Sequence, residues 1–125
     1  MPIQFDHHLV FARDKHESAQ FLTKLLGLPE PIPSGMFVSV RFDNAVTIHF
    51  VEPQIDFPIQ HYAFLVDDDS FDAIFARIQA DGMQFWADPR CQLPGEINHN
   101  NGGRGCYFLD PSGHGLEILT RPETP

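Results

Sequence analysis

Residues 103–119 read GRGCYFLDPSGHGLEIL, two apolar runs on either side of the tetrapeptide Asp110-Pro-Ser-Gly113. Asp, Pro, Ser and Gly form tight turns, so this segment predicts two neighbouring strands joined by a turn. The second run places Glu117 between Leu116 and Ile118. A charged side chain within an apolar strand is costly unless it is paired or bound to a ligand. Glu117 is therefore the first candidate functional residue.

Working outward from this segment, the chain shows one order of elements twice: a strand, an amphipathic helix, then further strands. The first half predicts a strand at 3–12, a helix capped by Asp14 and ended by Gly27, a loop at 29–35, and strands at 36–42 and 45–52. The second half predicts a strand at 60–66, a helix at 67–82, an extended piece at 83–88, a long loop at 89–105, and strands at 105–110 and 115–120.

The two halves are in register. The interval from His7 to His61 equals the interval from Phe21 to Phe75, so both pairs hold the same places in their own halves. At the far end of each half, His49 corresponds to Glu117. The interval between these two is wider, because the second half has the longer loop.

The chain is therefore expected to be one α+β domain, residues 1–125, built from two modules at about 1–53 and 59–121. A repeat of this length indicates two copies packed about a pseudo-two-fold axis.

Equivalent residues lie symmetrically about such an axis and can converge on it. The equivalent pairs are His7 with His61 and His49 with Glu117. Two imidazoles and a carboxylate are a known ligand set for Fe(II) and Mn(II), and Zn(II) also accepts it. Each residue taken alone would more often be a packed or solvated side chain, but their correlated placement favours a divalent-metal site at His7, His61 and Glu117. His49 is interpreted as a fourth ligand, a residue that orients a ligand, or a general base.

The loop PGEINHNNGGRG, residues 94–105, is a second source of polar side chains. If it closes over a bound substrate, Arg104 could orient a carboxylate or enolate and His99 could transfer a proton. The alternative is an ordinary solvated loop, in which polar residues are expected. His49, His99 and Arg104 are the candidate catalytic residues.

The composition excludes several classes of partner. The formal charge is −9, from 17 acidic and 8 basic residues, so binding to nucleic acid or to an anionic membrane surface is not expected. There is neither a membrane-length apolar run nor a signal peptide, which predicts a cytoplasmic protein with Cys91 and Cys106 reduced. Twelve phenylalanines favour an apolar-walled cavity for a small-molecule substrate.

Three segments, DHHLVFARD at 6–14, HYAFLVDD at 61–68 and residues 103–119, together resemble the vicinal oxygen chelate superfamily. That superfamily includes glyoxalase I, bleomycin-resistance proteins, fosfomycin-resistance transferases and extradiol dioxygenases. The resemblance implies paired βαβββ modules whose mixed sheets curve into a cup around a divalent metal (Fe, Mn, Ni or Zn), with the helices outside. It also implies a homodimer and metal ligands at His7, His61 and Glu117.

The implied function is that of an enzyme, a lyase, isomerase or dioxygenase, whose small substrate chelates the metal through adjacent oxygens. The chain departs from some relatives. His49 replaces the acidic or amide ligand of glyoxalase I, and the only lysines, Lys15 and Lys24, suit a phosphonate poorly. The alternatives are a non-catalytic protein that sequesters a drug or metabolite, and a structural relic of the fold whose polar residues are merely satisfied.

Overall fold

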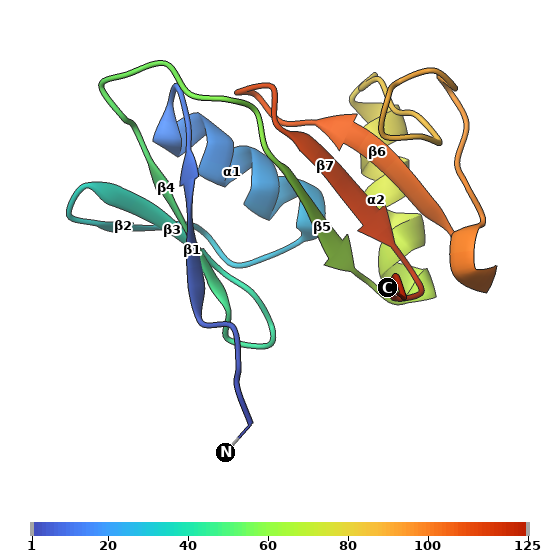
Figure 1. Ribbon diagram of the computed structural model, residues 1–125, viewed down its shortest axis with the longest axis horizontal. Helices are drawn as coiled ribbons and strands as arrows, with labels where there is room; N and C mark the ends of the chain where they lie inside the picture. The colour runs from blue at the N-terminus through green and yellow to red at the C-terminus, as the bar shows by residue number, and fades with distance from the viewer. Residues whose placement is uncertain (1, 125) are drawn as a thin grey trace. The chain divides into compact units, whose positions relative to one another are not determined.

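The protein forms two compact units, Met1–Pro58 and Ile59–Pro125, in a computed structural model that describes residues 2–124 (Figure 1). The first unit contains β1 (His7–Phe11), α1 (Lys15–Leu26), β2 (Ile32–Ser34), β3 (Phe37–Arg41) and β4 (Thr47–Val51). The second contains β5 (His61–Leu65), α2 (Asp68–Ala80), the 3₁₀ turn η1 (Asn100–Gly102), β6 (Gly105–Leu109) and β7 (Gly115–Leu119). The predicted α+β class with two modules is confirmed, whereas the expectation of a single domain stays a prediction.

The first unit carries a four-stranded mixed sheet in the order β1-β4-β3-β2, with β1 parallel to β4. The prediction of a plain loop at 29–35 is wrong, because Ile32–Ser34 pairs with β3 as an antiparallel edge strand. Three residues are too few to show an alternating pattern. Pro33 also makes the strand hard to recognise in the sequence. A proline is nevertheless tolerated in an edge strand, where the backbone groups on the outer side have no neighbouring strand to pair with.

The second unit carries a three-stranded sheet in the order β5-β7-β6, with β5 parallel to β7. The extended piece predicted at 83–88 forms no strand there; Trp86 makes only isolated bridges, to Pro94 and Tyr107. The chain turns away after Trp86, because the Asp88 carboxylate accepts hydrogen bonds from the backbone N–H of Gln92 and of Leu93. The second module therefore has one strand fewer than the βαβββ pattern implies.

Both helices begin and end where the sequence predicts. The Asp14 carboxylate accepts from the N–H of His16 and of Glu17, and Gly27 ends α1 with φ 72°. The Asp67 carboxylate caps α2 at Ser70. None of the helices in the described range is long and apolar enough to cross a membrane.

Each sheet has one buried face and one face that is more exposed within its own unit. The buried residues include Ala19, Leu22, Val10, Val38 and Phe50 in the first unit and Phe71, Ile74, Ile78, Phe108, Leu116 and Ile118 in the second. Residues that alternate with the buried ones, such as His7 and Leu9 on β1 and His61 on β5, are exposed. His7 and His61 therefore lie outside the cores, whereas Glu117 is buried between the core residues Leu116 and Ile118 of β7.

Candidate metal centre

In the second unit, His61 and Glu117 form a directly contacting pair. His61 Nε2 lies 3.2 Å from Glu117 Oε1, and His61 Nδ1 lies 2.9 Å from the carbonyl oxygen of Gly115. A carbonyl oxygen can only accept, so Nδ1 carries the hydrogen and Nε2 is directed at the carboxylate. Glu117 is only 8 % exposed, and this burial raises its pKa, with the nearby His61 opposing the rise.

This chemistry fits a divalent ion. The Gly115 carbonyl holds Nδ1 of His61, so Nε2 is the nitrogen that faces the carboxylate of Glu117. An oriented imidazole and a partly desolvated carboxylate are the donors that Fe(II), Mn(II) and Zn(II) take. His61 and Glu117 are thus suited to hold a metal.

Tyr107 on β6 adjoins both members of this pair. Its ring centroid lies 5.8 Å from that of His61, and its hydroxyl donates a hydrogen bond to Glu117. Burial first, and then the charge of Glu117, raise the pKa of Tyr107 to about 12, so the phenol stays protonated at neutral pH. The sequence analysis missed Tyr107. The turn at 110–113 contained the signal, because an antiparallel register through it pairs Tyr107 with Glu117.

In the first unit, His7 lies beside His49, with ring centroids 5.3 Å apart. His7 Nδ1 contacts Asp6 Oδ2 at 2.7 Å, and His49 Nδ1 contacts Ser39 Oγ at 2.7 Å. Phe37 stacks on the His49 ring at 5.1 Å. Neighbours therefore fix both rings through Nδ1, which leaves Nε2 as the nitrogen for a ligand.

The two pairs occupy equivalent places in their sheets. Leu9 of β1 pairs with His49 of β4, and Ala63 of β5 pairs with Glu117 of β7. The register therefore confirms the equivalence that the sequence intervals predict.

The four residues are distributed evenly over the two units. Across residues 2–124, no three or more His, Cys, Asp or Glu side chains gather closely enough to hold an ion. His61 contacts Glu117, and His7 packs against His49. His7 and His49 belong to the first unit and His61 and Glu117 to the second, and the ligand set His7, His61 and Glu117 stays a prediction.

Arg104 binds the start of α2. Its Nη1 donates to Asp72 Oδ1 at 2.6 Å, and its Nη2 donates to Asp68 Oδ1 at 3.2 Å. Its guanidinium carbon lies 4.4 Å from the centre of the Phe71 ring. These contacts tie the long loop to α2 and occupy the guanidinium that the sequence analysis assigned to substrate. His99 is exposed just before η1. The predicted catalytic roles of His99 and Arg104 stay predictions.

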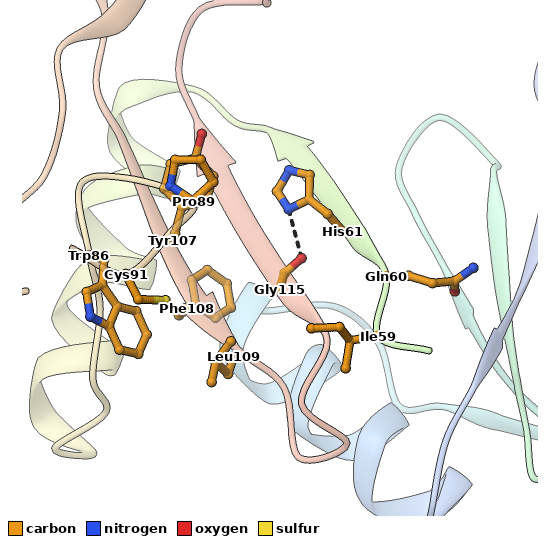
Figure 2. A pocket seen from close by; sticks show the side chains of 10 residues that line it. All are labelled: Ile59, Gln60, His61, Trp86, Pro89, Cys91, Tyr107, Phe108, Leu109 and Gly115. Atoms are coloured by element: carbon orange, nitrogen blue, oxygen red, sulfur yellow. Dashed lines mark hydrogen bonds between the residues drawn. The ribbon is translucent and has the colours of Figure 1, made fainter. Parts of the chain in front are cut away.

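An apolar pocket of about 240 Å³ opens beside His61 (Figure 2). Its lining residues come from the start of β5, the segment after α2, β6 and the start of β7: Ile59, Gln60, His61, Trp86, Pro89, Cys91, Tyr107, Phe108, Leu109 and Gly115. This lining contains no Asp, Glu, Lys or Arg. Tyr107 and Glu117 also line a smaller pocket of about 70 Å³, whose other lining residues include three asparagines, Arg104 and Arg121. The His61–Glu117 pair thus lies between an apolar pocket, which His61 lines, and a polar pocket, which Glu117 lines.

The two cysteines differ in accessibility. Both are free; Cys91 is exposed and Cys106 is buried. Burial, with a smaller effect of the Glu117 charge, raises the pKa of the Cys106 thiol to about 12. Because the thiolate is the reactive form, a disulfide reagent is expected to modify one thiol per chain quickly and the second only after denaturant is added. Cys91→Ser should abolish the fast phase, and a fast phase that survived this substitution would contradict the assignment.

Comparison with known proteins assigns the fold to a family. The chain matches the Glyoxalase/Bleomycin resistance protein/Dioxygenase superfamily over residues 4–118. It is 29% identical over 126 residues to the glutathione transferase FosA of Serratia marcescens, with 93% of this chain and 80% of that protein covered.

Solved structures agree with this assignment. Oxidase ChaP-H1 is 50% identical with a TM-score of 0.94, covering 97% of this chain and 98% of that one. Oxidase ChaP-H2 is 52% identical with a TM-score of 0.93, covering 98% and 96%. The lactoylglutathione lyase of Agrobacterium tumefaciens, at 18% identity, 95% and 94% coverage and a TM-score of 0.73, shares the fold. The predicted resemblance is confirmed: the chain belongs to the Glyoxalase/Bleomycin resistance protein/Dioxygenase superfamily.

Proposed function

We propose that the protein is a metal-dependent oxidase of this superfamily, with His7, His61 and Glu117 as the metal ligands. The observation that carries the proposal is the His61–Glu117 pair, in which the Gly115 carbonyl holds Nδ1 so that Nε2 is directed at the carboxylate. The equivalent placement of His7 and His49 supports a third ligand from the other kind of unit. Two relatives named oxidases, at 50% and 52% identity, favour oxidation over the lyase and isomerase alternatives.

The metal and the surrounding side chains have separate roles in this proposal. A divalent ion such as Fe or Mn, held by these residues, would act as a Lewis acid on a substrate with two adjacent oxygens and support oxidation of that substrate by dioxygen. Tyr107, protonated and lining the apolar pocket, donates to Glu117 and so orients the carboxylate for the metal. His49, held by Ser39, takes the proton that a substrate hydroxyl loses on binding.

The pocket beside His61 favours an uncharged, flat substrate. Its volume of about 240 Å³ is lined by Trp86, Tyr107 and Phe108 among other uncharged side chains. The lining itself contains no Lys or Arg to pair with the negative charges of a phosphonate or a glutathione adduct. An aromatic ring with two adjacent oxygens fits both the apolar walls and the proposed ligand set.

The same pocket supports a second candidate, a binding protein that holds such a compound without turnover. A homodimer and a cytoplasmic location accompany both candidates as predictions.

Metal analysis of the tag-free protein, followed by oxygen-uptake assays, tests the proposal. After anaerobic incubation with Fe(II), Mn(II), Ni(II) or Zn(II) and removal of free metal, we expect one ion per chain in the wild type and in His16→Ala, a control on the exposed surface of α1. His61→Ala should bind none. The iron or manganese form is expected to consume oxygen with a panel of catechols. A wild type that takes up none of the four ions would refute the oxidase proposal, and tight catechol binding by that metal-free protein would support the second candidate.

A further inference from the structure

His114 is a fully buried histidine that the proposed chemistry does not use. Its exposed fraction is 0 %, and its Nδ1 accepts a hydrogen bond of 2.9 Å from the backbone N–H of Gln60. A nitrogen that accepts carries no hydrogen, so the neutral ring has its proton on Nε2. A buried imidazole in a fixed tautomer that binds backbone is a structural link between two segments.

The turn before β7 fixes His114 in place. Asp110 Oδ1 accepts from the N–H of Ser112 at 2.9 Å and from the N–H of His114 at 2.8 Å. Asp110 is itself buried. The imidazole therefore projects from a turn whose backbone is held by a buried carboxylate.

The link from His114 ends next to a proposed metal ligand. Gln60 precedes His61, and its carbonyl oxygen accepts from the N–H of Gly115 at 2.9 Å. His61 Nδ1 donates to the carbonyl oxygen of Gly115 at 2.9 Å, the bond drawn in Figure 2. Three hydrogen bonds thus connect residues 60–61 to residues 114–115. The bond to His114 lies beyond the strand pairing, since the β5–β7 register begins at His61.

We propose that His114 is a positioning residue for His61. By holding Gln60 just before β5, it keeps the His61 ring against the Gly115 carbonyl, so that Nδ1 keeps its hydrogen and Nε2 faces Glu117. Strand ends open more easily than strand centres, so a bond at this end has a direct effect on the first residue of the strand. The consequence for metal affinity rests on the proposed function, whereas the consequence for the tautomer does not.

Two substitutions at His114 separate the acceptor from the packing. His114→Leu fills much of the space but leaves the Gln60 N–H without its acceptor. His114→Asn returns an amide oxygen close to the place of Nδ1. Ile78→Ala, on the buried face of α2, is a control that loses packing in the same unit but keeps His114 and its bond to Gln60.

The first measurement is the ¹⁵N spectrum of the histidine side chains in metal-free protein. We expect a hydrogen on Nδ1 of His61 in the wild type, in His114→Asn and in Ile78→Ala, and a mixture of rings with and without this hydrogen in His114→Leu. The second measurement is Co(II) affinity by competition with a chromophoric chelator. His114→Leu should bind Co(II) about 10- to 100-fold more weakly, and His114→Asn should recover most of that loss.

An unchanged His61 tautomer in His114→Leu, with Co(II) affinity within twofold of the wild type, would overturn the inference. If His114→Leu does not fold, His114→Gln replaces it, because the longer side chain moves the amide oxygen away from Gln60. The inference would then be overturned if His61 had the same protonation at Nδ1 in His114→Gln and in His114→Asn. If the wild type binds no Co(II), the proposed function fails, and the tautomer comparison still decides the role of His114.

Discussion

Replacing Glu117 by Gln is expected to abolish metal binding and to lower turnover by about 10³-fold or more. Loss of metal-ion catalysis removes several kcal/mol of transition-state stabilisation, and a tenfold change in rate corresponds to about 1.4 kcal/mol. The glutamine keeps the shape of the side chain and an oxygen that can accept from Tyr107. A neutral amide lacks the charge of the carboxylate and binds a divalent ion more weakly, so the change acts on the metal more than on the fold.

The stability of the metal-free protein separates these two effects. Burial raises the pKa of Glu117 in the folded state, so ionisation of this carboxyl destabilises the fold, and stability is lost as the pH rises through this pKa. Glutamine cannot ionise. Metal-free Glu117→Gln is therefore expected to be at least as stable as the metal-free wild type at neutral pH, and the difference should shrink as the pH is lowered. Denaturant unfolding of both proteins at several pH values measures this.

Glu123→Gln is the matched control. Glu123 is exposed, lines the same small polar pocket as Glu117, and undergoes the same change of charge. It should retain one metal per chain and wild-type turnover. A Glu117→Gln protein that still bound one ion with unchanged affinity would remove Glu117 from the ligand set.

Sequence intervals carried most of the information about the candidate site. His7 and His61 are separated by the same number of residues as two phenylalanines in the helices, and His49 corresponds to Glu117. These intervals are enough to predict that β1 pairs with β4 in the same register in which β5 pairs with β7. Such intervals are informative because a strand displaced by one residue would turn every side chain to the other face. The same alternation correctly places His7 and His61 at exposed positions, next to the less exposed His8 and Tyr62.

Contacts made through loops could not be predicted in this way. Arg104 belongs to a glycine-rich loop with no periodicity, so nothing in the sequence shows that its partners are Asp68 and Asp72. The loss of a strand around Trp86 depends on the turn that Asp88 closes through its side chain. Tyr107 is an intermediate case, since its pairing with Glu117 follows once the turn register is known.

The core beneath the long loop depends on Phe71, and Phe71→Ala is expected to lower the free energy of unfolding by about 3–5 kcal/mol. Phe71 is 0 % exposed and stacks on Phe75 with ring centroids 5.9 Å apart. Its ring also supports the Arg104 guanidinium at 4.4 Å. Alanine therefore creates a cavity and removes the surface on which Arg104 rests. Urea unfolding followed by circular dichroism measures the loss.

Two further variants distinguish the cavity from the loop contact. Phe75→Ala, half-buried on the same helix, should cost less than half as much as Phe71→Ala, because part of its ring is already in water. Arg104→Ala should cost about 1 kcal/mol, since its carboxylate partners are exposed and its stacking is partly solvated. If the Phe71 ring organises the Arg104 contacts, the double variant Phe71→Ala/Arg104→Ala will lose clearly less free energy of unfolding than the sum of the losses in Phe71→Ala and Arg104→Ala. Strict additivity would mean that Asp68 and Asp72 hold the loop to α2 without help from the ring.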